Sequence, residues 1–71
     1  MSAQKAIASI EFEIARLSRS FNPVPDRTFV MGMIELAEIA ELIDRATANR
    51  FRDALDAKFC ERNDFLKRTS T

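Results

Sequence analysis

The residues that interrupt helices are confined to one short part of this chain. Its 71 residues include two prolines, Pro23 and Pro25, and a single glycine, Gly32. Proline disfavours helical geometry in the residue before it, so a helix that begins near the N-terminus must stop at this segment. The sequence beyond Gly32 contains no residue that obliges another stop. This distribution predicts an all-α protein made of two helices and a proline loop.

The segment before the prolines carries the pattern of a helix that packs along another helix. Ser2 can cap its first turn, because a serine hydroxyl accepts a hydrogen bond from a free backbone amide there. Apolar residues then recur at alternating spacings of four and three, which forms one seam on a helix. The members of this seam are Ala3, Ile7, Ile10, Ile14, Leu17 and Phe21. We expect a helix over about 3–19, a loop over 21–27 and an antiparallel helix after the loop.

The sequence after the loop is compatible with two structures. The apolar stripe drifts around the helix between Ile43 and Phe51, which indicates either a change of packing partner or a break. A break near 47–49, where Thr47 or Asn49 could cap a third helix, gives a three-helix bundle. Because no glycine or proline lies there, the sequence favours a continuous helix over about 28–67. The primary expectation is therefore an antiparallel helix hairpin with a long second helix, and three helices are the alternative.

A continuous second helix has a consequence for assembly. The first helix could cover only about half of it, so apolar side chains further along would lie bare in a single chain. Its first half also has an apolar face wide enough for more than one neighbour. A second copy would cover these surfaces in a dimeric helical bundle. The residues expected at an interface with a second copy or with a partner protein are Phe29, Met33, Leu36, Ile43, Phe51, Leu55, Phe59 and Leu66.

Gly32 stands inside the predicted second helix, where glycine is less stable than alanine. Met31 and Met33 flank it, and methionine adapts to irregular surfaces. Close approach of two helices within the fold is the expected reason for this glycine, and a contact surface for a partner is the alternative.

The composition argues against catalysis and against metal sites. The chain has no histidine and one cysteine, Cys60, so it cannot form an internal disulfide and lacks the usual zinc ligands. We expect Cys60 to be a buried core thiol. Glu35, Glu38, Glu41 and Asp44 recur every three residues, a spacing that spreads them around a helix and does not bring them together. We therefore expect a protein that is not an enzyme and that binds no cofactor and no metal.

Charge and hydropathy indicate which classes of partner and which location to expect. The formal net charge is zero, whereas nucleic-acid binders usually carry a strongly positive face. We do not expect nucleic acid as a partner, although the basic stretch in the last third leaves a small DNA-binding transcriptional regulator as the alternative. No apolar run approaches the roughly 20 residues that span a bilayer, and no signal peptide is visible. With one unpaired cysteine, a cytoplasmic location is the expectation.

The layout of the whole chain is similar to that of the small accessory proteins that phages encode to bind and disable host proteins. The resemblance lies in a first helix that ends in residues 20–26, SFNPVPD, and a longer second helix through residues 39–43, IAELI. It implies a homodimeric helical hairpin that inhibits a host protein such as a transcription regulator, and it transfers no functional residue. The sequence thus predicts a single helical domain over 1–71 that acts as a protein–protein interaction module.

Overall fold

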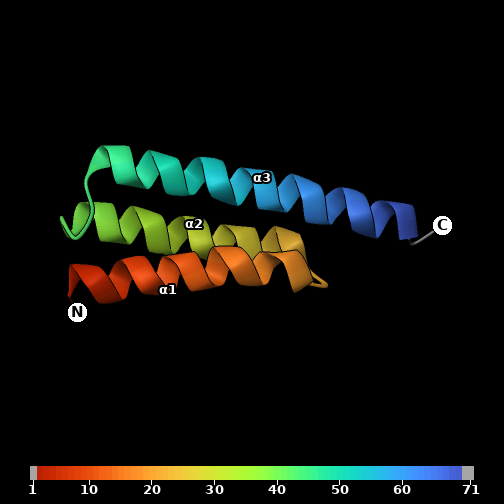
Figure 1. Cartoon of the computed structure of the whole chain (residues 1–71), viewed down its shortest axis with the longest axis horizontal. Coiled ribbons are helices and arrows are strands. Elements are labelled where there is room, and N and C mark those ends of the chain that lie inside the picture. The colour runs from red at the N-terminus through yellow and green to blue at the C-terminus, as the bar shows by residue number, and fades with distance from the viewer. Residues whose placement is uncertain (1, 70–71) are drawn as a thin grey trace.

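The computed structural model describes residues 2–69, which form three α-helices and one short 3-10 helix. Their bounds are α1, Ala3–Arg16; η1, Leu17–Arg19; α2, Pro23–Ile39; and α3, Arg45–Thr69. The chain reverses its direction after η1 and again after α2, so consecutive helices run antiparallel (Figure 1). Each α-helix contacts the other two. The all-α prediction is confirmed over these residues, and the molecule is a rod of 44 × 19 × 15 Å.

The predicted first helix is confirmed over most of its length. The Ser2 hydroxyl accepts a hydrogen bond from the Lys5 backbone N–H at 3.2 Å and caps the helix as expected. The buried members of the predicted seam are Ile10, Ile14 and Leu17. The seam ends there, because the backbone leaves α-helical geometry after Arg16. Phe21 consequently points into solvent, with 84% of its surface exposed.

The proline loop is shorter than predicted. We expected a loop over 21–27, but α2 already begins at Pro23, and both prolines lie in its first turn. Proline is compatible with this position because the first backbone N–H groups of a helix have no intrahelical partner. The connection is therefore limited to residues 20–22. Ser20 closes it, since its hydroxyl donates to the Asp26 carboxylate and accepts from the Asn22 N–H at 3.0 Å.

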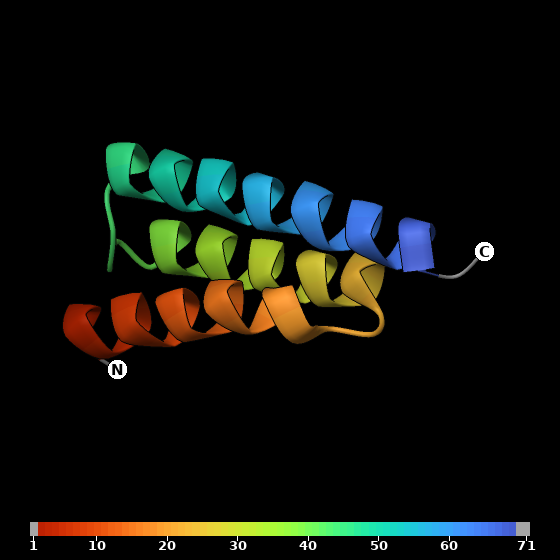
Figure 2. The same cartoon turned by 45° about the vertical axis from the view of Figure 1, so that its right-hand side comes forward.

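The prediction of a continuous helix over 28–67 is wrong, because α2 ends at Ile39 and the chain turns back (Figure 2). Glu41 has a φ of 60°, which is left-handed backbone geometry. The Leu42 N–H donates to the Ala37 carbonyl at 2.9 Å, and the Glu41 N–H donates to the Glu38 carbonyl at 3.0 Å. These two bonds form a Schellman motif, which usually has glycine at the left-handed residue. The glutamate at this residue explains why the sequence showed no stop signal.

The third helix begins at Arg45, two residues before the predicted break at 47–49. The Asp44 carboxylate accepts a hydrogen bond from the Thr47 N–H at 2.8 Å, and the Asp44 carbonyl accepts from the Ala48 N–H at 2.9 Å. Asp44 is therefore the N-cap residue of α3. The described residues thus form three helices, which was the alternative expectation. The drift of the apolar stripe marks the reversal of the chain.

The cap of α3 predicts a pH-dependent contribution to stability. Hydrogen bonds from the Thr47 backbone N–H and side chain lower the pKa of Asp44, because they favour its charged form. A lowered pKa stabilises the fold above the ordinary carboxyl pKa, and this contribution disappears as pH falls through the lowered value. We expect Asp44→Ala to lower the urea midpoint at pH 7, with a smaller difference from wild type at pH 3.

Asp44→Asn is the control for this prediction, because an amide oxygen can cap the helix without titrating. It should keep most of the stability at pH 7. A difference between Asp44→Ala and wild type that is equally large at pH 3 and pH 7 would contradict the assignment.

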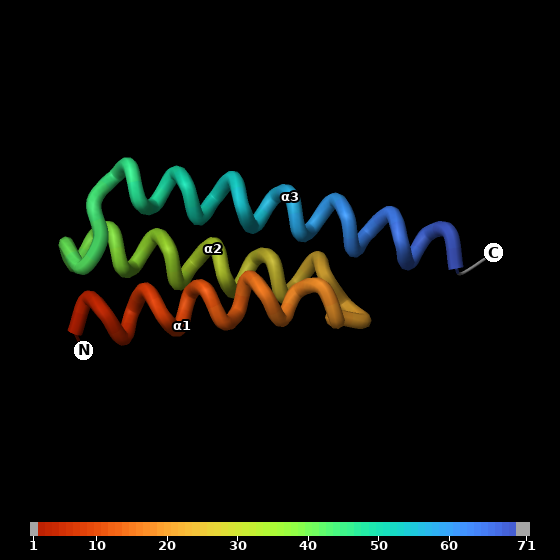
Figure 3. Tube along the Cα trace, in the orientation of Figure 1, coloured from red at the N-terminus to blue at the C-terminus, as the bar shows by residue number. Residues whose placement is uncertain are grey.

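The core lies along the line where the three helices meet. All three helices, η1 and the α2–α3 connection contribute to it, and the fold needs no disulfide. Its largest fully buried side chains are Ile10, Leu17, Val30, Ile34 and Leu55. Ile43, in the α2–α3 connection, is also buried and anchors that turn to the core. Figure 3 shows α3 running back along α2 and continuing beyond the other two helices.

Candidate interaction surface

Two of the eight predicted interface residues belong to the core. Leu55 has no exposed surface and Ile43 is 7% exposed, because α3 folds back over α2. These two side chains are therefore not available to a second copy or to a partner protein. Their assignment to an interface depended on the continuous second helix, and because that helix is absent, the assignment is wrong.

Four further predicted residues are only partly accessible. Phe51, Phe59 and Met33 pack against the core, and Leu66 is half-buried. The second half of the apolar stripe therefore does not lie bare in a single chain, so it gives no reason to expect a second copy. A homodimer stays a prediction. The guanidinium of Arg27 lies over the Phe59 ring, 5.3 Å from its centre, and shields the ring further from solvent.

The remaining two predicted residues, Phe29 and Leu36, are exposed on α2, with 59% and 68% of their surfaces accessible. The prediction did not include several other exposed apolar residues, among them Ile39 on α2 and Phe12 on α1, which are 70% and 64% exposed. The signal for Ile39 was the unusual width of the apolar face of α2. For Phe12 there was only its position outside the buried seam of α1.

An apolar groove of about 370 Å³ runs between α1 and α2. Alanines lie along it, while longer apolar side chains flank them, and Ser9 is its one polar side chain. The lining residues are Ala6, Ser9, Ile10, Met33, Leu36, Ala37, Ala40 and Leu42. Phe12 is one turn from Ser9 on α1 and Phe29 is one turn from Met33 on α2, so exposed rings extend the apolar surface beside the groove.

A second seam runs along the solvent side of α2 next to this groove. Its spacing alternates between four and three, the pattern by which one helix packs along another. We define this outer seam as Pro25, Phe29, Gly32, Leu36 and Ile39. Gly32 lies at its centre, and a Cβ atom built there would meet no atom within 4 Å. The expected reason for this glycine, close approach of helices within the fold, is therefore wrong.

Ion pairs hold α3 against the opposite side of α2. The Glu38 carboxylate accepts from Arg52 at 2.9 Å and from Arg45 at 3.2 Å, and the Arg52 hydrogen bond is the main cause of the lowered pKa of Glu38. Arg27 pairs with Asp56 at 2.7 Å. These contacts place α3 away from the outer seam, which stays open to solvent.

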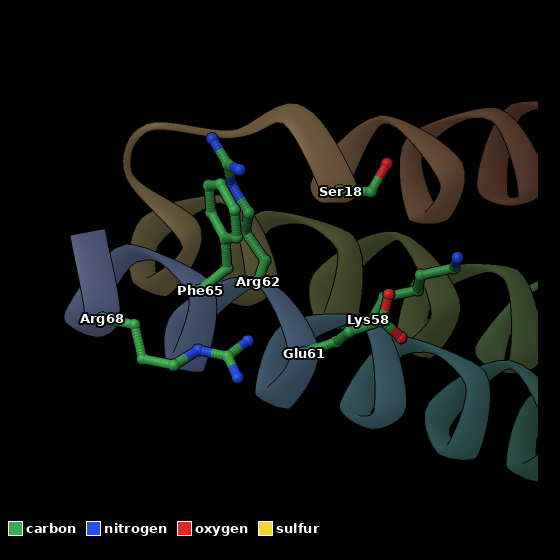
Figure 4. A pocket seen from close by; sticks show the side chains of 6 residues that line it. All are labelled: Ser18, Lys58, Glu61, Arg62, Phe65 and Arg68. Atoms are coloured by element: carbon green, nitrogen blue, oxygen red, sulfur yellow. The ribbon is translucent and has the colours of Figure 1, made fainter.

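A second hollow, of about 330 Å³, lies beside η1 and the last turns of α3. Most of its lining side chains are charged. The lining residues are Ser18, Lys58, Glu61, Arg62, Phe65 and Arg68. Figure 4 shows Arg62 and Phe65 side by side, pointing toward the α1–α2 connection, with Arg68 directed elsewhere. The Arg62 Nε donates a hydrogen bond to the Ser20 carbonyl at 2.7 Å, so this hollow lies where α3 is joined to the α1–α2 connection.

Cys60 and the acidic side chains are the other groups that the sequence singled out. Cys60 is exposed, so the expectation of a buried thiol was wrong. Within residues 2–69, no three histidine, cysteine or acidic side chains gather into a possible metal site. None of the helices in that range is both long enough and apolar enough to cross a membrane.

Comparison of the chain with protein-family models, with curated proteins and with solved structures finds no match.

Proposed function

We propose that the protein is a small protein-interaction module that binds a helix of another chain in the apolar groove and along the outer seam. The observation that carries this proposal is the bare apolar surface of Phe12, Phe29, Leu36 and Ile39, each between 59% and 70% exposed. At 150–250 Å² for each large side chain, they expose on the order of 450 Å². Patches of this size on small soluble proteins often mark binding sites.

The form of the surface favours a helix as the bound element. A groove between two helices, with apolar positions spaced by four and three beside it, accommodates the apolar face of an amphipathic helix. The helix can come from a second copy or from another protein. The form that we propose is a homodimer that inhibits or modulates another protein such as a transcription regulator, by covering a helix that the target protein needs.

Site-specific photo-crosslinking tests the proposal in the source cell. A photoreactive phenylalanine analogue at position 36 should give a discrete covalent adduct, because Leu36 is at the centre of the surface. The same analogue at Asp53, an exposed residue of α3, is the matched control and should give none. An adduct of twice the 8.1 kDa chain mass would contain a second copy, and a different mass would show another protein.

A further variant distinguishes specific binding from non-specific association with the apolar surface. Phe29→Asp in the same chain should abolish the adduct, since it places a charge on the same seam, about two helical turns from position 36. Equal labelling from positions 36 and 53, or an adduct that survives Phe29→Asp, would contradict the proposal.

A further inference from the structure

We infer that the outer seam of α2 pairs with the same seam of a second copy in antiparallel orientation, with Leu36 of each chain seated on Gly32 of the other. This inference rests on the proposed function and names the chain that occupies the surface. The surface shares Phe29 and Leu36 with the interface predicted from the sequence. It excludes Leu55, which is buried, and Phe59, which packs against the core.

Gly32 provides the first step. Glycine in the middle of an exposed helix is less stable than alanine, and nothing within this chain approaches it. The helix therefore carries an unfavourable residue that its own packing does not require. A gap in the side-chain surface, placed at the centre of an exposed apolar seam, leaves room for an apolar side chain from outside the chain.

The order of side chains along the outer seam provides the second step. In an antiparallel pair of identical helices, a two-fold axis between Gly32 and Leu36 makes each of them face the other. The same axis makes Phe29 face Ile39 of the second copy. The large side chain of Leu36 then meets the missing side chain of Gly32, and two large apolar residues fill the outer layers. The seam is complementary to itself in this register.

The apolar area of the outer seam, together with the groove beside it, approaches what a dimer interface of standard size buries. A standard interface buries about 800 Å² from each partner, and homodimer interfaces are about 65% apolar, or roughly 520 Å² of apolar surface per copy. Phe29, Leu36 and Ile39 of the outer seam supply about two thirds of that area. The groove lining adds further apolar atoms on the same side of α2. One extra copy is therefore sufficient to cover the surface.

Charge opposes this pairing only weakly. The two-fold axis brings Glu35 of the two chains to the same side of the seam, and residues 28–44 contain no base to compensate. Exposed charges of this kind change an equilibrium constant by about two- to five-fold. Burial of several hundred Å² of apolar surface changes it by orders of magnitude. The apolar complementarity therefore decides the outcome.

The first experiment measures the mass of the full chain in solution over a range of concentrations, in a Cys60→Ser background. We expect a dimer that dissociates on dilution. Leu36→Asp should leave a monomer with the helical content of wild type, because Leu36 is 68% exposed and its replacement spares the core.

Gly32→Ala separates the dimer from the fold. Measured at a concentration where the chain is monomeric, it should raise the urea midpoint, since alanine favours the helix and meets no atom of the chain. In the same variant the dissociation constant should rise at least ten-fold, because the added methyl occupies the space of Leu36 from the second copy. Unchanged dimer affinity in Gly32→Ala would overturn the inferred register.

Cysteine pairs test the register directly. In the Cys60→Ser background, Phe29→Cys and Ile39→Cys should form a disulfide when the two variants are mixed and oxidised, and neither should form one alone. A disulfide in Phe29→Cys alone would indicate a different register and overturn the inference.

A chain that stays monomeric at every concentration would also overturn it. If the position 36 adduct then contained another protein, the proposed function would stand with a different occupant. Without any adduct, both proposals would fail.

Discussion

Leu55→Ala should remove about half of the free energy of unfolding. Leu55 is completely buried in α3, at the point where the three helices meet. Replacement of a buried leucine by alanine costs about 2–5 kcal/mol, because apolar contacts are lost and a cavity remains. A chain of 71 residues has a total stability of only about 4–11 kcal/mol. Urea unfolding followed by circular dichroism measures the loss.

Leu36→Ala is the control for this result, since it makes the same chemical change at an exposed position of α2. Measured at a concentration where the chain is monomeric, it should alter the stability by no more than about 0.5 kcal/mol. Equal stabilities of the two variants would show that Leu55 is not in the core. Such a result would restore the long second helix, in which Leu55 serves association.

The first helix could be predicted from the sequence because its signals are local. Ser2 caps it as expected, and the spacing by four and three identified Ile10, Ile14 and Leu17 as core residues. Periodicity of this kind is set by helix geometry alone, so it does not depend on what lies on the other side. The pattern could not show where α-helical geometry ends, which is why Phe21 was placed in the seam.

The reversal after α2 could not be predicted because its signals are unusual. A left-handed residue at a helix end is usually glycine, and Glu41 holds this position here. Two backbone hydrogen bonds and the burial of Ile43 hold this conformation in place. The drift of the apolar stripe toward Phe51 was the available sign, and it was compatible with both structures.

Two residues of the candidate surface, Phe29 and Leu36, could be predicted from the sequence, whereas Phe12 and Ile39 could not. Phe29 and Leu55 are both large apolar residues of helices, and the sequence pattern alone does not tell which of them faces inward. Once α3 folds back along α2, it buries Leu55 and leaves the outer seam of α2 open. The position of the exposed surface is therefore a consequence of the turn at residues 40–44.

Arg62 joins α3 to the α1–α2 connection. Its Nε donates a hydrogen bond to the Ser20 carbonyl at 2.7 Å, and its guanidinium lies 5.8 Å from the centre of the Phe21 ring and 5.1 Å from that of Phe65. A hydrogen bond to a charged group contributes about 1.5–3 kcal/mol. Exposed cation–π contacts add about 0.5–1 kcal/mol each. We expect Arg62→Ala to lower the free energy of unfolding by about 2 kcal/mol, after allowance for its partial exposure to solvent.

Arg19→Ala is the matched control, because Arg19 is an exposed arginine at the same end of the molecule. Its replacement should change the stability by less than about 0.5 kcal/mol. Arg62→Lys should recover only part of the loss, since an ammonium can reach the carbonyl but cannot stack its plane on the rings. Because Arg62 holds the connection from α3, Arg62→Ala should also speed amide hydrogen exchange at Ser20 and Asn22. Equal effects of the Arg62 and Arg19 replacements would show that the contacts of Arg62 do not stabilise the bundle.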